Sequence, residues 1–130
     1  MSEIRILIAE DDFRNRVIYR KILQRFFPGI VIEEAEDGEE ALEKIRANMP
    51  TLLILDLIMP RMNGLQVLAE LKEEGRLTEM AVVVISGYPP EGRQFEEIFR
   101  YGKNIGFLQK PFNNNAFSGI IEKYLSGNEE

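Results

Sequence analysis

Apolar residues follow two alternating patterns along the chain. Short continuous apolar runs, typical of β-strands, occur at Ile4–Ala9, Ile30–Ile32, Leu52–Leu55, Ala81–Ile85 and Ile105–Leu108. Between and after these runs, apolar residues recur every three or four positions, which predicts helices. The first expected helix covers Phe13–Phe27, the second begins at Asp37-Gly38, and the third begins after a cap at Asn63. The fourth follows Pro89-Pro90, and the last carries Phe117, Ile120, Ile121 and Tyr124. Five strands alternating with five helices predict an α/β fold.

The third and fourth apolar runs contain no polar residue, which is typical of parallel strands buried on both faces. We therefore expect one doubly wound parallel sheet with helices on both sides. In such a sheet, ligands bind in the crevice beyond the carboxyl ends of the strands, where the strand order reverses. The polar residues that follow each strand are the first candidates for chemistry.

A chain of 130 residues with 45% hydrophobic and 29% charged residues suits one folded domain. We assign residues 1–125 to that domain and residues 126–130 to a short tail. The sequence has neither cysteine nor histidine, which excludes thiol chemistry, a histidine nucleophile and histidine metal ligands. The apolar runs are too short for membrane insertion, and the first residues do not resemble a signal peptide, so a cytoplasmic location is expected.

The net charge of −6 disfavours direct binding to nucleic acid or to anionic lipid. A local basic group occurs in the first predicted helix, at Arg14, Arg16, Arg20, Lys21 and Arg25. With this overall charge, we interpret the group as a solvated helix face in preference to a nucleic-acid patch.

Polar residues follow four of the predicted strands, and parallel strands bring these ends to one rim. They are Glu10-Asp11-Asp12 after the first strand, Asp56 after the third, Ser86-Gly87 after the fourth and Lys110-Pro111 after the fifth. Two carboxylates about 4 Å apart repel by about 4 kcal/mol at an effective dielectric constant of about 20, so a cation is expected among them. Oxygen ligands favour Mg²⁺, with Mn²⁺ as the alternative, over zinc.

The other residues at this rim suit a phosphoryl group. Lys110 supplies a movable positive charge, Ser86 a hydroxyl donor and Gly87 an unobstructed backbone N–H. Around a carboxylate nucleophile, these groups provide the positioning and charge neutralisation that phosphoryl transfer requires.

From Ile4 to about Leu125 the chain resembles the receiver domain of two-component response regulators, the CheY-like family. The matching segments are Ile6-Leu7-Ile8-Ala9-Glu10-Asp11-Asp12, Ala35-Glu36-Asp37-Gly38-Glu39-Glu40-Ala41-Leu42, Leu55-Asp56-Leu57-Ile58-Met59-Pro60-Arg61-Met62-Asn63-Gly64 and Lys110-Pro111-Phe112. Each segment alone is modest support, but their order and separation are specific. The resemblance implies a flavodoxin-like sheet with strand order 2-1-3-4-5.

The resemblance also implies a role for each residue near the metal. Asp56 would be the phosphoacceptor and Asp11 a direct metal ligand. Glu10 would act on the metal through water, and Asp56 with the backbone carbonyl of Ile58 would complete the protein ligands. Asp12 is better explained as the N-cap of the first helix than as a ligand.

A second set of residues is implied to respond to the phosphoryl group. Ser86 and Lys110 would contact its oxygens, and the bond between Lys110 and Pro111 is expected to be cis. Phe107 falls at the family's aromatic switch, although it has no hydroxyl and is expected in the core in any case. Bulky Ile58 and Tyr88 near the site predict slow autodephosphorylation.

The resemblance implies a signalling switch rather than a turnover enzyme. Its phosphodonor would be the phosphohistidine of a histidine kinase or histidine phosphotransfer protein, docked near Arg14 and Ile18 of the first helix. Output to an unidentified partner, or onward relay, would use the surface of the fourth helix, fifth strand and fifth helix. The chain would be a monomer or a phosphorylation-dependent dimer, and either a stand-alone regulator or a receiver from a longer one.

Three other functions compete with this interpretation. A haloacid-dehalogenase-like phosphatase needs a second acid where this chain has Ile58. A nucleotide or flavin binder needs a glycine-rich first loop, where Glu10 and Asp11 would repel phosphate. A degenerate receiver that acts only as a docking module is the third alternative, which we rank low because every expected site residue is present. Pro89-Pro90 are expected to delay the start of the fourth helix and to stiffen the loop before it.

Overall fold

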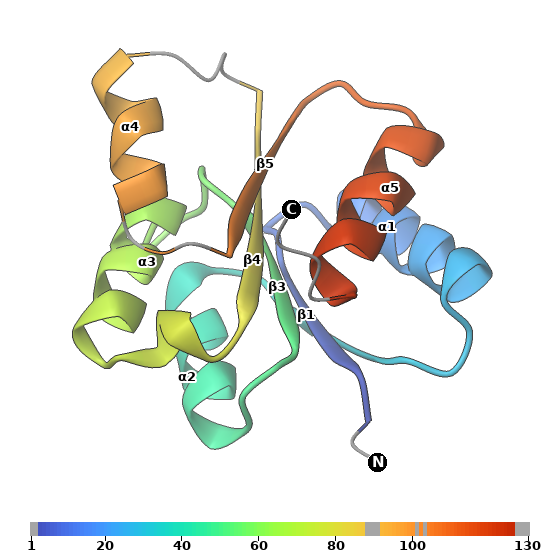
Figure 1. Cartoon of the computed structure of the whole chain (residues 1–130), viewed down its shortest axis with the longest axis horizontal. Helices are drawn as coiled ribbons and strands as arrows, with labels where there is room; N and C mark the ends of the chain where they lie inside the picture. Colours follow the sequence, from blue (N-terminus) through green and yellow to red (C-terminus); the bar gives the residue numbers. More distant parts are fainter. Residues whose placement is uncertain (1–2, 88–91, 101, 103, 127–130) are drawn as a thin grey trace.

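The structure is a computed structural model that describes residues 3–87, 92–100, 102 and 104–126. Within these residues, a single parallel sheet forms the centre of the molecule (Figure 1). Its strands are β1 (Arg5–Ala9), β2 (Val31–Ala35), β3 (Leu52–Asp56), β4 (Ala81–Ser86) and β5 (Ile105–Gln109). They lie in the order β2-β1-β3-β4-β5, which confirms the expected topology.

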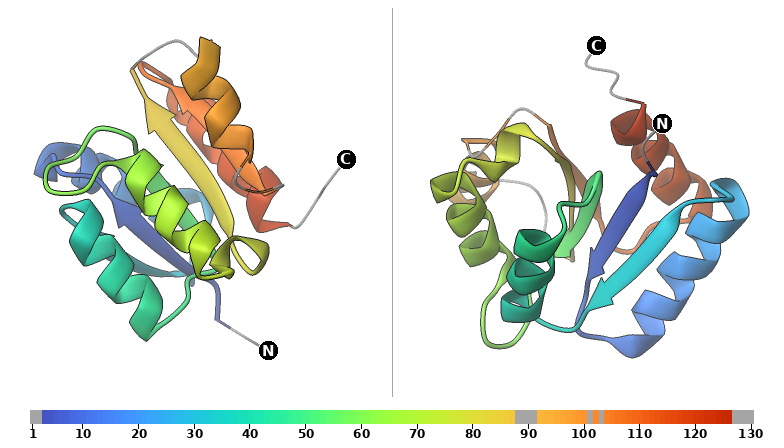
Figure 2. Two further views of the ribbon diagram at one scale, coloured as in Figure 1. Left: turned by 90° about the vertical axis from the view of Figure 1, so that its left-hand side faces the viewer. Right: turned by 90° about the horizontal axis from the view of Figure 1, so that it is seen from below.

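Helices cover both faces of the sheet, as Figures 1 and 2 show. They are α1 (Phe13–Phe26), α2 (Gly38–Ala47), α3 (Gly64–Glu73), α4 (Gly92–Arg100) and α5 (Asn114–Leu125), with a short 3₁₀ helix, η1 (Arg76–Thr78), before β4. The helices α1 and α5 lie on one face, and α2, α3 and α4 lie on the other. None of the helices in the described residues is long and apolar enough to cross a membrane.

The interior consists of two apolar clusters, one on each face of the sheet. Along β1, Leu7 and Ala9 pack toward α2 and α3, whereas Ile6 and Ile8 pack toward α1 and α5. Because both faces are buried, successive strand residues are all apolar although they point in opposite directions. This arrangement explains the continuous apolar runs in the sequence.

Short polar side chains begin the helices that follow strands. Asp12, Asp37, Asn63 and Asn113 each accept a hydrogen bond from a backbone N–H in the first turn of α1, α2, α3 and α5. Asn63 forms a reciprocal capping box with Gln66. The caps of α1, α2 and α3 confirm the predicted starts of these helices, and all four fix the loops at the carboxyl edge of the sheet.

The predictions about the basic group of the first helix and about the end of the second strand were each wrong in part. Arg14, Lys21 and Arg25 are exposed as expected, but Arg16 is buried and Arg20 is half-buried, and these two pair with Glu34. These ion pairs also allow β2 to extend to Ala35, beyond the predicted end at Ile32. The added part of the strand contains two glutamates, which interrupt its apolar pattern in the sequence.

The apolar spacing of α1 accounts for only part of its buried face, where Ile22 and Leu23 are buried. Ile18 and Phe26 follow the helical apolar spacing but are exposed to 49% and 42%. Tyr19 is buried instead, with its ring 5.9 Å from that of Phe112 and 5.2 Å from that of Phe117. The aromatic residues after β5 thus determine which side of α1 packs inward.

Candidate functional site

The parallel strands bring the predicted site residues to one edge of the sheet. Glu10 directly follows β1, Asp56 ends β3, Ser86 ends β4 and Lys110 directly follows β5. Asp56 is opposite Ile85 in the strand register, so it lies at the centre of the edge. The order of the strands reverses between β1 and β3, which is where a doubly wound sheet binds its ligand.

Three carboxylates meet at this edge. Oxygens of Glu10, Asp11 and Asp56 all lie within 4.8 Å of one another. Glu10 is 2% exposed and Asp56 5% exposed, whereas Asp11 reaches solvent. They line an open hollow of about 490 Å³, whose other lining residues are Asp12, Asn15, Ile58, Gly87 and Lys110. The oxygen-only donor set and the small separation fit a hard divalent cation such as Mg²⁺.

One ammonium group partly neutralises the carboxylates. Lys110 Nζ lies 3.0 Å from Asp56 Oδ2 and 3.6 Å from Glu10 Oε1. The other Asp56 oxygen, Oδ1, accepts a hydrogen bond from the Ile58 backbone N–H at 2.9 Å. Burial lowers the pKa of Lys110, but the hydrogen bond and charge of Asp56, together with Glu10, outweigh it and raise the pKa above its ordinary value. Lys110 therefore stays charged at neutral pH.

The close packing of these carboxylates changes the pKa of Glu10. Burial, followed by the close contact with Asp56, raises the pKa of Glu10 to about 7, against the lowering effects of the Asp12 N–H and of Lys110. Its Oε1 is buried and accepts no hydrogen bond from the described residues. A buried, unsatisfied carboxylate oxygen next to two other carboxylates is the feature that a bound cation would satisfy.

The other predicted site residues lie at the same edge. Ser86 is fully buried, and an added Cβ at Gly87 would meet no atom within 4 Å, so the approach to its backbone is open. Phe107 is half-buried and packs against the cluster under α2 and α3. Ile58 is 55% exposed beside the hollow, and Tyr88 lies outside the described residues.

Two structural expectations at the edge are confirmed. The bond between Lys110 and Pro111 is cis. Asp12 caps α1, with its Oδ1 accepting a hydrogen bond from the Arg14 N–H at 2.8 Å, so this carboxylate already has a structural role. The prediction that Pro89-Pro90 delay the fourth helix falls on residues outside the described ones.

Sequence reasoning overlooked Arg16, whose guanidinium donates to the backbone carbonyl of Glu10 at 2.7 Å. A signal for it was present in β2, where adjacent Glu33 and Glu34 interrupt an otherwise apolar strand and therefore require cationic partners. Arg5 and Arg16 supply them.

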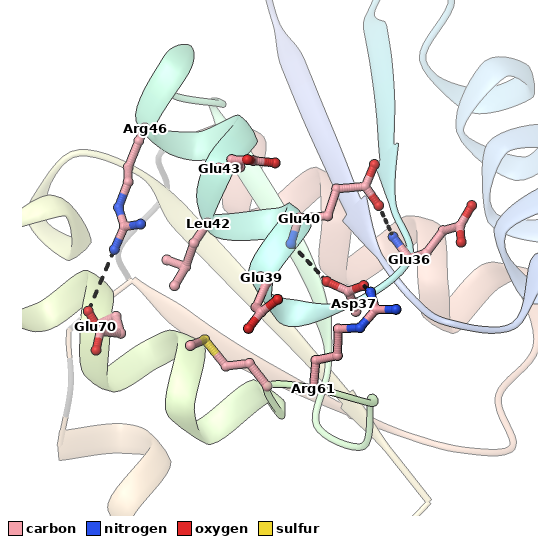
Figure 3. Close-up of a pocket in the computed structure, with 10 residues that line it drawn as sticks. Glu36, Asp37, Glu39, Glu40, Leu42, Glu43, Arg46, Arg61 and Glu70 are labelled. Carbon is pink, nitrogen blue, oxygen red and sulfur yellow. Dashed lines mark hydrogen bonds and ion pairs between the residues drawn. The ribbon is translucent and has the colours of Figure 1, made fainter.

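A larger hollow, of about 750 Å³, lies between α2 and α3 away from the carboxylate cluster (Figure 3). Its walls are mostly acidic side chains. Asp37 caps α2 through Oδ1 and accepts from Arg61 Nη1 through Oδ2, while Arg46 pairs with Glu70. These pairs join α2 to the loop after β3 and to α3. The charged residues around this hollow therefore have a structural role in holding these elements together.

Comparison with known proteins agrees with this geometry. The sequence profile of the response regulator receiver domain matches residues 6–122. The chain therefore belongs to the receiver domain family of two-component response regulators, which act as signalling switches.

Individual relatives extend over nearly the whole chain. The polar-differentiation response regulator DivK of Brucella anthropi is 28% identical over 120 residues, which is 92% of this chain and 94% of that protein. A CheY-like receiver domain from Methanospirillum hungatei has a TM-score of 0.82 and 25% identity, covering 97% of this chain and 96% of that one. The chemotaxis protein CheY4 of Vibrio cholerae, with a TM-score of 0.83 and 23% identity over 95% of this chain and all of the other, shares the fold.

Proposed function

We propose that this receiver domain accepts a phosphoryl group on Asp56 from the phosphohistidine of a histidine kinase or histidine phosphotransfer protein, in a reaction that depends on Mg²⁺. The observation that carries the proposal is the position of the Asp56 carboxylate. It lies within 4.8 Å of oxygens of Glu10 and Asp11 and 3.0 Å from the ammonium of Lys110. Family membership supplies the class of phosphodonor.

In the transfer, a carboxylate oxygen of Asp56 attacks phosphorus and forms an acyl phosphate. The bond between phosphorus and the donor imidazole nitrogen breaks, its electron pair stays on nitrogen, and the imidazole is released in a neutral form after proton uptake from solvent. Lys110, which donates a hydrogen bond to Asp56, would contact the phosphoryl oxygens of the acyl phosphate and neutralise part of their negative charge.

Glu10, Asp11, Asp56 and the backbone carbonyl of Ile58 would hold Mg²⁺, with Mn²⁺ as a substitute. The ion would neutralise the carboxylates and the incoming phosphoryl charge. Glu10, whose Oε1 is buried, would act on the ion through a water, and the exposed Asp11 would bind it directly.

Phosphorylation would bias the domain between two conformations. Ser86 and Lys110 would close on the phosphoryl oxygens, with the Gly87 N–H at the open edge, and Phe107 would repack as β4 moves. Because Phe107 is half-buried on β5, this change would reach the surface formed by α4, β5 and α5 and serve output or relay. Residues 1–125 would act as one unit in the cytoplasm, with residues 126–130 outside it.

The test is intact mass after incubation with acetyl phosphate, with and without Mg²⁺. We expect one phosphoryl adduct on the wild-type chain only with Mg²⁺, and none on Asp56→Asn. Asp12→Asn is the matched control, because asparagine caps a helix as well as aspartate and Asp12 is outside the cluster of Glu10, Asp11 and Asp56. A folded wild-type protein that binds Mg²⁺ but gains no adduct would instead indicate a docking module independent of phosphorylation.

The lifetime of the adduct tests a finer prediction. Ile58 beside the hollow should hinder a water approaching phosphorus opposite Asp56, so slow autodephosphorylation is expected. Ile58→Ala should shorten the half-life of the adduct several-fold by the same mass measurement. An unchanged half-life would exclude Ile58 as the barrier.

A further inference from the structure

Arg16 is a buried cation that contacts the backbone of Glu10, one of the three clustered carboxylate residues. It lies one turn into α1 and is 6% exposed. Its Nη1 donates to the backbone oxygen of Glu10 at 2.7 Å, and its Nε donates to Glu34 Oε1 at 2.9 Å. A buried guanidinium that bridges a backbone carbonyl and a carboxylate is fixed in position, since both acceptors are themselves part of the β1 and β2 edge.

Glu10 is consequently held at every polar atom except one. Its backbone N–H donates to the Ala35 oxygen at 3.1 Å, and its backbone oxygen accepts from Arg16. Its side-chain Oε2 accepts from the Asp12 N–H at 3.0 Å. The remaining atom, Oε1, is the buried oxygen that faces Asp56 and Lys110. The surrounding bonds therefore direct a single oxygen into the cluster.

Holding the carboxylates together is energetically unfavourable without a cation. The three side chains repel one another, and the segment from Glu10 to Asp12 would relieve the repulsion by moving away from Asp56. Arg16 opposes this movement, because its hydrogen bond to the Glu10 carbonyl restrains the backbone of that segment.

We propose that Arg16 is a positioning residue for the metal site, and that it sets the Mg²⁺ affinity by restraining the backbone of Glu10. This inference rests on the proposed function, since it concerns the same cation. Partners behind metal ligands commonly change metal affinity by about 10–100-fold when removed, and we expect about tenfold here. Lysine cannot reproduce the role, because one ammonium cannot span both acceptors with the fixed fork of arginine.

Arg20 provides a matched control on the same helix. It also pairs with Glu34, through a 2.7 Å hydrogen bond from its Nε, and its Nη2 donates to the Ile32 oxygen. Arg20 makes no hydrogen bond or ion pair with Glu10, so Arg20→Gln removes a comparable ion pair between α1 and β2 and leaves the restraint on Glu10 intact.

The experiment measures the dissociation constant for Mg²⁺ by isothermal titration calorimetry on the full chain. Arg16→Gln and Arg16→Lys should bind Mg²⁺ about tenfold more weakly, and Arg20→Gln should bind like the wild type. With acetyl phosphate, Arg16→Gln should need about tenfold more Mg²⁺ for half-maximal phosphorylation, while the rate at saturating Mg²⁺ stays within about twofold. If Arg16→Gln does not fold, Glu34→Gln should weaken Mg²⁺ binding through loss of the partner that orients Arg16.

Wild-type affinity in Arg16→Gln would overturn the positioning role, as would equal weakening in the Arg16 and Arg20 variants. In either case the wild-type chain would still bind Mg²⁺ and be phosphorylated, and the proposed function would stand. A wild-type chain that binds no Mg²⁺ would overturn both the proposed function and the role of Arg16.

Discussion

Replacing Glu10 by glutamine should stabilise the metal-free protein, and more so at high pH. Burial and the nearby Asp56 raise the pKa of Glu10 to about 7, from 4.5 for the ordinary side chain. Between these two pH values the folded chain keeps a proton that the unfolded chain has lost, so stability falls as pH rises from 4.5 through 7. Glutamine is nearly isosteric, can still accept from the Asp12 N–H, and never ionises.

The magnitude follows from the two pKa values. At about 1.4 kcal/mol per pKa unit, ionised Glu10 costs the folded state about 3 kcal/mol at pH 8, and less than about 1 kcal/mol at pH 5. Unfolding entropy near about 2.1 cal/mol/K per residue gives about 0.27 kcal/mol/K for 130 residues, so the gain at pH 8 corresponds to about 10 °C in Tm.

The assay is thermal and urea unfolding in EDTA at pH 5 and pH 8, for wild type, Glu10→Gln and Glu43→Gln. Glu43 is an exposed residue of α2, and its variant should stay within about 0.5 kcal/mol of wild type at both pH values. Adding saturating Mg²⁺ at pH 8 should remove most of the advantage of Glu10→Gln, because the ion favours the ionised carboxylate. An equal gain at pH 5 and pH 8, or a loss at pH 8, would refute the reasoning.

Three further predictions concern the metal, the loop after β3 and a helix cap. Mg²⁺ at about 100 times its dissociation constant should raise the free energy of unfolding by about 2.7 kcal/mol in thermal melts, and much less in Asp56→Asn. Gly38→Ala should destabilise by about 2 kcal/mol in urea, because its Cβ would overlap the backbone oxygen of Met62; an unchanged midpoint would show that the loop yields freely. Asn63→Ala should lose about 1 kcal/mol and Asn63→Asp little, since aspartate keeps the cap; equal losses would contradict a capping role.

The sheet and the placement of the site could be predicted because each depends on short-range pattern. Apolar runs gave the strands, and parallel strands necessarily bring Asp56, Ser86 and Lys110 to one edge. The end of β2 could not be predicted in this way, since Glu33 and Glu34 extend the strand only through ion pairs with arginines distant in sequence.

The burial of Arg16 and Tyr19 escaped prediction for a related reason. Helical apolar spacing does not mark Tyr19 as an inward residue, and its ring packs against those of Phe112 and Phe117, which are distant in the sequence. The raised pKa of Glu10 likewise results from burial and contact with Asp56, which only the assembled edge creates. Roles of the individual site residues follow from family membership and stay predictions until the phosphorylation experiments are done.

In the described residues the two apolar clusters lie on opposite faces of the sheet, with the strand backbones between them, so each can be altered without repacking the other. Substitutions under α1 and α5 should therefore combine additively with substitutions under α2, α3 and α4. Over evolutionary time, one side of the sheet could diverge to suit a new binding partner while the other retained its existing shape. The carboxylate edge, which draws on strands shared by both clusters, would be the part of the molecule least free to vary.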